Sequence, residues 1–248
     1  MELIEWNHIT SLSTNASKLA GPLRALLRSN AAGYKGVKCI REIGVMRIIE
    51  VVDYQDSWTK NFEDESQLLN DAVSVLNPTI HHIGSTAVQG LAAKPIIDIL
   101  IEVENVIDLD SYNSEMKAAG YYGRGELGIP GRRFFQKGGD NRSHQVHAFK
   151  KGHFDVVRHL AFRDYLINHP EVALQYATLK RHVAMESNND IDRYCDGKSE
   201  FVQKYEKQAV EWYLFNKSSK KDALMRASSW GVNPQGDIQV SISIRREQ

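Results

Sequence analysis

The sequence lacks several features that would assign it directly to a class of protein. Its 248 residues contain only two cysteines, and 31 basic side chains are balanced by 31 acidic ones, for a formal net charge of zero. Two isolated cysteines exclude a disulfide framework and a cysteine-based zinc site, and they favour a reducing compartment. A zero net charge gives no electrostatic signal for nucleic acid or for an anionic membrane surface.

Long hydrophobic runs and a secretion signal are also missing. The most apolar stretch, residues 96–103, is far too short to cross a membrane. The first residues lack the basic start and the apolar core of a signal peptide. Because the hydrophobic share of 42% is ordinary for a globular protein, we expect a soluble cytoplasmic protein with no membrane partner.

The composition changes at both ends of the chain. Residues 1–45 are rich in hydroxyl side chains and then basic, and Met46 stands just before a β-rich run. We expect residues 46–215 to form the functional domain, with an N-terminal extension at 1–45 and a C-terminal extension at 216–248. Met46 as an alternative translation start is a hypothesis that mass spectrometry of the native protein would test. A Met1 terminus in every molecule would contradict it.

The spacing of apolar residues predicts strands first and helices later. Alternating or continuous apolar residues predict strands at 48–52, 79–83, 96–103, 134–135, 145–149 and 238–244. Helical spacing predicts helices at 58–76, 109–119, 155–168, from 170 onward, and at 198–213. This order favours an α+β fold with a helical C-terminal part.

The most informative segment runs from residue 82 to residue 103. Gly84 can adopt backbone angles closed to other residues, and Ser85 and Thr86 can cap a following helix. Free N–H groups and two hydroxyls would then face a phosphate. Asp98 interrupts the apolar strand that follows, where an ionised carboxylate is costly unless it is paired or bound to a cation. The pattern predicts a phosphate and metal site.

Three ordered blocks resemble the GrpB family: residues 82–98, 141–147 and 158–171. The resemblance covers roughly residues 48–212. It implies a nucleotidyltransferase-like mixed sheet with flanking helices. In sites of that type a Gly-Ser turn holds a triphosphate, and strand carboxylates bind two metal ions. The resemblance therefore implies that Gly84, Ser85 and Thr86 bind the phosphates.

One position departs from the two-metal pattern. The second carboxylate is expected two residues after Asp98, because residues two apart on a strand point the same way, roughly 6.6 Å apart. Leu100 occupies that position. Glu102 shares the face but lies about 13 Å from Asp98 along the strand, so it cannot take the place of the missing ligand.

The resemblance places His147 on a strand next to Asp98, where the third carboxylate would be. Asp98 and His147 are therefore the candidate catalytic residues, and together they could hold one divalent cation, Mg²⁺ or Mn²⁺. His147 could instead act as a general base. The alternative is a hydrogen-bonded structural pair with no metal ion.

Two basic residues are candidates for neutralising phosphate charge. Lys94 stands at the mouth of the Asp98 strand, and Arg133 lies in a glycine-rich segment. Ordinary solvent-exposed side chains are the alternative for both.

We expect the protein to bind a nucleotide or phosphorylated metabolite with a divalent cation. If it is active, transfer of a nucleotidyl group is the natural chemistry. The alternative is a non-catalytic module for ligand binding or protein interaction that retains the fold, and Leu100 favours it.

Overall fold

The computed structural model describes residues 48–224, 228–232 and 238–242. The chain divides into two compact units, one at Val37–Asn216 and one that combines Met1–Gly36 with Lys217–Gln248. The predicted extension at 1–45 lies outside the described residues.

The first unit contains a mixed sheet and most of the helices. Its strands are β1 Thr79–Ile83, β2 Ile97–Val103, β3 Tyr121–Gly123, β4 Arg133–Lys137 and β5 His144–Lys150. Its helices are α2 Ser57–Val73, α3 Asn113–Ala118, α4 Phe154–Asn168, α5 Pro170–Glu186 and α6 Ile191–Leu224, whose last residues belong to the second unit. Short 3₁₀ turns are η3 Ser74–Leu76, η4 Ser85–Ala87 and η5 Val106–Tyr112.

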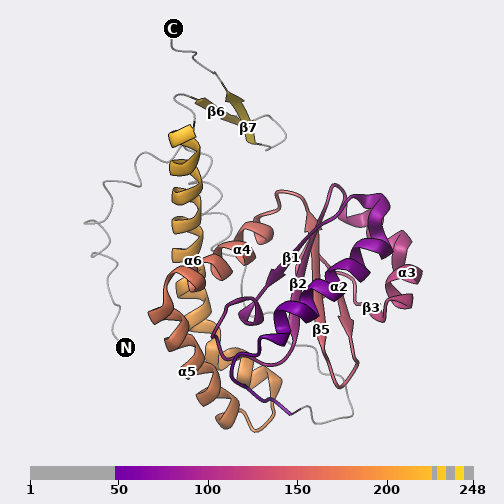
Figure 1. Ribbon diagram of the computed structural model, residues 1–248, viewed down its shortest axis with the longest axis vertical. Coiled ribbons are helices and arrows are strands. Elements are labelled where there is room, and N and C mark those ends of the chain that lie inside the picture. Colours follow the sequence, from indigo (N-terminus) through magenta and orange to yellow (C-terminus); the bar gives the residue numbers. More distant parts are fainter. Residues whose placement is uncertain (1–47, 225–227, 233–237, 243–248) are drawn as a thin grey trace, which may run out of the picture. The chain divides into compact units, whose positions relative to one another are not determined.

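The five strands follow the order β1-β2-β5-β4-β3 across the sheet (Figure 1). β2 and β5 are parallel, and the other neighbours are antiparallel. The inner strand β2 is buried except at Asp98 and Glu102, which share one face because side chains alternate along a strand.

One face of the sheet packs against α2 and α3. Ile99 and Ile101 of β2 are fully buried there, in one core with Leu69 of α2, Met116 of α3 and Phe135 of β4. Burying such side chains supplies most of the stability of a domain, at about 25 cal/mol per Å² of apolar surface. This face is the main hydrophobic core.

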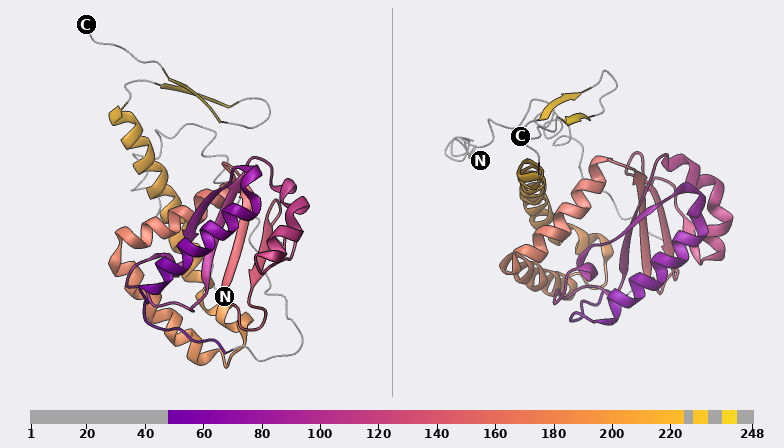
Figure 2. Two further views of the ribbon diagram at one scale, coloured as in Figure 1. Left: turned by 45° about the vertical axis from the view of Figure 1, so that its right-hand side comes forward. Right: turned by 45° about the horizontal axis from the view of Figure 1, so that its top comes forward.

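The helical C-terminal part lies on the other side of the sheet, opposite α2 and α3 (Figure 2). Val88 and Leu91, in the segment between β1 and β2, pack with Tyr176 of α5 and Phe201 of α6. Arg163 of α4 donates a hydrogen bond of 2.9 Å to the carbonyl oxygen of His82 on β1. The Gly84 turn is therefore enclosed between the sheet and these helices.

The predicted fold class is confirmed: an α+β protein with a mixed sheet, flanking helices and a helical C-terminal part. Details differ where elements are short. The strand expected at 48–52 is a single bridge between Val52 and Ala93. The helix expected at 109–119 divides into η5 and α3, and the three-residue strand β3 was too short to predict from alternation.

The second unit contains a hairpin of β6 Ser228–Val232 and β7 Ile238–Ile242, paired antiparallel. The alternation at 238–244 thus corresponds to a strand as far as Ile242. Among the described residues, no helix has the length and apolar character needed to span a membrane.

Candidate functional site

The Gly84 turn lies directly against the Asp98 carboxylate. Gly84 has φ +69°, in the region that favours glycine. A Cβ atom placed on it would lie 2.5 Å from Oδ2 of Asp98, well inside van der Waals contact. Only glycine fits between the turn and the carboxylate, so the sequence motif brings the two predicted site elements together.

The segment after Gly84 is a single 3₁₀ turn, and no side chain caps it. The expected capped helix is therefore wrong, because Val88 already has extended backbone angles. The Thr86 hydroxyl is buried and hydrogen-bonds Nε2 of His82 at 3.0 Å. Burial and the nearby Arg163 lower the pKa of His82 to about 4, so its ring is neutral. Of the two hydroxyls predicted to face a phosphate, that of Thr86 is hydrogen-bonded to His82, and that of Ser85 is hydrogen-bonded to a side chain of α5.

Lys180 of α5 is the partner of Ser85. Its Nζ atom donates a hydrogen bond of 2.7 Å to Ser85 Oγ and lies 4.4 Å from the centre of the Tyr176 ring. The residue is only 3% exposed. Burial, reinforced by the positive charges of Lys198 and Arg181, lowers the pKa of Lys180 to about 7. A buried amine thus lies against the glycine-serine turn.

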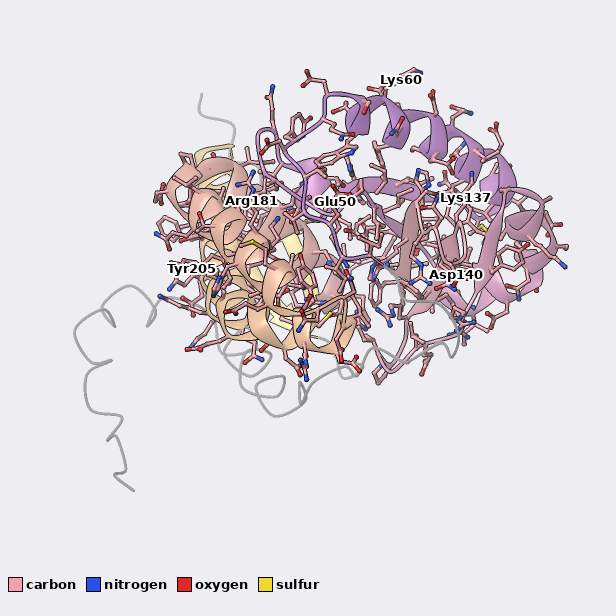
Figure 3. The ribbon with its side chains drawn as sticks, turned by 90° about the horizontal axis from the view of Figure 1, so that it is seen from below. Glu50, Lys60, Lys137, Asp140, Arg181 and Tyr205 are labelled. Atoms are coloured by element: carbon pink, nitrogen blue, oxygen red, sulfur yellow. The ribbon has the colours of Figure 1, made fainter. Side chains whose placement is uncertain are left out.

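The next residue on α5 points elsewhere. Arg181 lies on the helical side of the protein (Figure 3) and forms an ion pair with the exposed Asp53. Of this adjacent basic pair, Lys180 alone bonds Ser85.

Two further lysines complete the group around Asp98. Lys94 and Lys198 lie over the same Tyr194 ring, 4.9 Å and 5.5 Å from its centre. Burial raises the pKa of Asp98 to about 6, and the charges of Lys94, Lys198 and Lys180 oppose that rise. We call Gly84, Ser85, Asp98 and these three lysines the lysine cluster. Its positive charges outnumber its carboxylate, so it can attract an anionic group.

The register of the sheet separates His147 from Asp98. His147 does lie on β5, the strand beside β2, but its Cα partner is Leu100, and Gln145 is opposite Asp98. Nδ1 of His147 is hydrogen-bonded by Arg132 at 3.3 Å. The structure therefore gives His147 a partner other than Asp98, in place of the expected Asp98–His147 pair.

The surroundings of His147 do not favour the general-base role that was one of its predicted functions. Burial and the charges of Arg132 and Arg158 lower its pKa to about 3, so it is a weak base near neutral pH. Its ring centre lies 5.1 Å from that of His159, whose pKa also falls well below its usual value through burial and the charge of Arg158. Two neutral imidazoles thus face each other beside two arginines.

The donor set around Asp98 does not fit a resident metal ion. No group of three or more His, Cys, Asp or Glu side chains suited to a metal occurs in the part of the chain that the structure describes. Asp98 has the apolar Leu100 two residues away and three lysines around it. Mg²⁺ and Mn²⁺ prefer several oxygen ligands, and one carboxylate among ammonium groups does not supply them.

The structure does not bring Arg133 to this site. Arg133 is paired in register with Ala148, and Ala148 with Ile101, so it lies on the opposite face from Asp98. It forms a bidentate ion pair with Asp110, at 2.7 Å and 2.8 Å. Both residues line a separate pocket of about 340 Å³. A one-residue difference along a strand reverses the face, so Arg133 does not join Gly84 and Asp98, and its role in binding phosphate stays a prediction.

Sequence reasoning missed Lys180, Lys198 and Tyr194. Lys180 follows Tyr176 by four residues and precedes Val183 by three, so it lies on the buried stripe of α5. A charged residue on an apolar stripe is the signal that could have identified it. Lys198 and Tyr194 carry no such signal, because their position depends on how α6 packs.

Comparisons with known proteins agree with this architecture. The family model described as GrpB protein matches residues 48–208. "UPF0157 protein YqkA" from Bacillus subtilis is 43% identical over 166 residues, which cover 67% of this chain and 48% of that protein. The chain therefore spans about half the length of that relative. "Glutamate-rich protein GrpB" from Alkalihalophilus pseudofirmus is 35% identical over 157 residues, 61% of this chain and 90% of the relative.

A solved structure is also similar to this chain. The crystal structure of the conserved protein GrpB from Enterococcus faecalis aligns with a TM-score of 0.64 and 41% identity, over 66% of this chain and 99% of that one. The fold is the mixed α+β sheet with flanking helices that the resemblance implied. The chain belongs to the GrpB family.

Proposed function

We propose that the lysine cluster binds the phosphate of a nucleotide or of another phosphorylated small molecule. The hydrogen bond of 2.7 Å between Lys180 and Ser85, at the turn enforced by Gly84, is the observation that carries this proposal. A hydroxyl and an ammonium group held against a glycine turn provide donors for phosphate oxygens. Lys94 and Lys198 add positive charge on the Asp98 side.

If the protein is an enzyme, the proposed reaction is transfer of a nucleotidyl group, with Asp98 beside the reacting phosphate. The divalent cation remains a prediction. His147, with a pKa of about 3, would position a group rather than accept a proton.

The second candidate is a non-catalytic module that binds a ligand or a partner protein. Leu100 in the second carboxylate position favours it, as does the arginine-bonded His147. An enzyme should lose turnover in Asp98→Asn and keep its fold, whereas a binding module should change only its affinity. The cytoplasm is the proposed location, on the basis of the isolated cysteines.

Thermal denaturation with a panel of nucleoside triphosphates tests the proposal. A ligand at 100 times its dissociation constant adds about 2.7 kcal/mol to the free energy of unfolding. We expect a nucleotide-dependent rise in melting temperature that is reduced in Lys180→Met and unchanged in Lys207→Met, which alters an exposed lysine of α6. The absence of a shift with every nucleotide would favour the interaction module.

A further inference from the structure

We infer that the lysine cluster recognises phosphate without a divalent cation, so that the ligand is the free phosphate compound and not its magnesium complex. This inference rests on the proposed function and specifies the form of its ligand. The juxtaposition that carries it is one carboxylate, Asp98, against a glycine-serine turn whose Ser85 hydroxyl bonds Lys180. Two more ammonium groups, those of Lys94 and Lys198, lie over a single tyrosine ring.

The balance of charge is the first argument. A phosphate group carries about −1.5 to −2 charges at neutral pH. A bound anion favours the protonated form of Lys180. Three charged lysines with one carboxylate then supply an excess of about two positive charges, which matches such a group. A divalent cation added to the same space would be repelled by the ammonium groups, since like charges interact strongly where water is largely excluded.

The second argument is that the ammonium groups are already held in place. Lys180 is fixed between Ser85 and the Tyr176 ring, and it is almost fully buried. Lys94 and Lys198 lie over one ring, that of Tyr194. Contacts of this kind reduce the entropy that a flexible lysine loses when it binds a ligand. The site is therefore organised for an anion.

The neighbours of Asp98 provide the third argument. On the same face of the sheet, its nearest partners in register are Gln145 on β5 and Ile83 on β1, and the next residue along β2 on that face is Leu100. None of these is a carboxylate. The position that would share a metal ion with Asp98 in a two-metal site is therefore apolar, and the opposing charges come from lysines.

Isothermal titration calorimetry with pyrophosphate tests the inference directly. The full-length protein is titrated once in excess EDTA and once in excess Mg²⁺. We expect binding in EDTA and a weaker apparent affinity in Mg²⁺, because the metal sequesters the free pyrophosphate. Lys180→Met and Lys198→Met should each weaken binding in EDTA by about tenfold or more, while Lys207→Met should not change it.

The outcomes separate this inference from the proposed function. Binding that is as tight or tighter in Mg²⁺, or that requires it, would overturn the metal-free inference and leave the phosphate proposal standing. No binding under either condition would overturn both. An equal loss in Lys207→Met would show that the effect is not specific to the cluster and would contradict the inference. Thermal unfolding of each variant confirms that a loss of binding is not a loss of fold.

Discussion

The two faces of the sheet use the same strands for different purposes. Toward α2 and α3, the side chains of β2 are Ile97, Ile99, Ile101 and Val103, all buried in one apolar core. Toward the C-terminal helices, β2 presents Asp98, Leu100 and Glu102. Because side chains alternate along a strand, one seven-residue segment can stabilise the fold on one side and hold charge on the other.

The polar residues of the second face also differ among themselves. Glu102 is held by His81 at 2.8 Å, and His147 by Arg132 at 3.3 Å, so each has a structural partner. Asp98 instead lies within the electrostatic reach of three lysines from three parts of the chain. This contrast is the reason that the proposed ligand site is the lysine cluster and not the histidine region.

A substitution on the apolar face of β2 should change the stability of the protein and leave its affinity for the ligand unchanged. Ile99→Ala should lower the free energy of unfolding by about 4 kcal/mol, since Ile99 is fully buried and the substitution leaves a cavity. The affinity of the folded protein for pyrophosphate should not change. Urea denaturation and calorimetry measure the two quantities. A loss below about 1 kcal/mol would mean that the packing described for this face is incorrect.

Gly84→Ala should affect both stability and binding. The added Cβ atom would meet Asp98 and would require left-handed backbone angles, with an expected cost of about 3 kcal/mol. Gly90→Ala is the matched control, because Gly90 has φ +77° but no atom near its Cβ position. It should cost only about 1 kcal/mol. Urea denaturation of the two variants compares them, and equal losses would show that contact with Asp98 is unimportant.

Lys180→Met should make the unliganded protein more stable while weakening phosphate binding. The folded state lowers the Lys180 pKa from 10.5 to about 7, so between these values the unfolded chain binds more protons. Wild-type stability should therefore rise as pH increases from 7 to about 10, and the variant should lack this rise.

The net gain at pH 7 can be estimated. Relief of the burial cost contributes about 4 kcal/mol. Loss of the Ser85 bond and the Tyr176 contact offsets about 2 kcal/mol, which leaves a gain of about 2 kcal/mol. Denaturation at several pH values measures it, and a variant less stable than wild type at pH 7 would contradict the cost assigned to burying the Lys180 amine.

Arg133→Gln should have the smallest effect. The ion pair with Asp110 is half exposed on the Asp110 side, and such pairs contribute up to about 1 kcal/mol. Because Arg133 faces away from Asp98, affinity for pyrophosphate should stay the same. Calorimetry checks this, and a tenfold loss of affinity would restore the role that the sequence predicted for Arg133.

The spacing of apolar residues along the chain was sufficient to predict much of the fold. The bounds of β1 agree with the predicted strand at 79–83, and β2 begins one residue after the predicted start. Gly84 and Asp98 were identified because a turn and a strand carboxylate are both signals within one short segment. The structure brings these two into contact, although their role in binding remains a prediction.

The rest of the site depends on packing that a single sequence does not encode locally. Lys180 lies 95 residues from Ser85 in the chain, and only the docking of α5 brings them together. The register of β5 decided that Gln145, and not His147, is opposite Asp98. The pairing of β4 with β5 places Arg133 on the face of the sheet opposite Asp98.

A crystal structure with pyrophosphate bound in the absence of divalent ions would show whether the ligand occupies the lysine cluster. We expect phosphate oxygens within hydrogen-bonding distance of Ser85 Oγ and of the ammonium groups of Lys180 and Lys198. Pyrophosphate bound instead in the pocket beside Arg133 and Asp110, with none at the Gly84 turn, would contradict it.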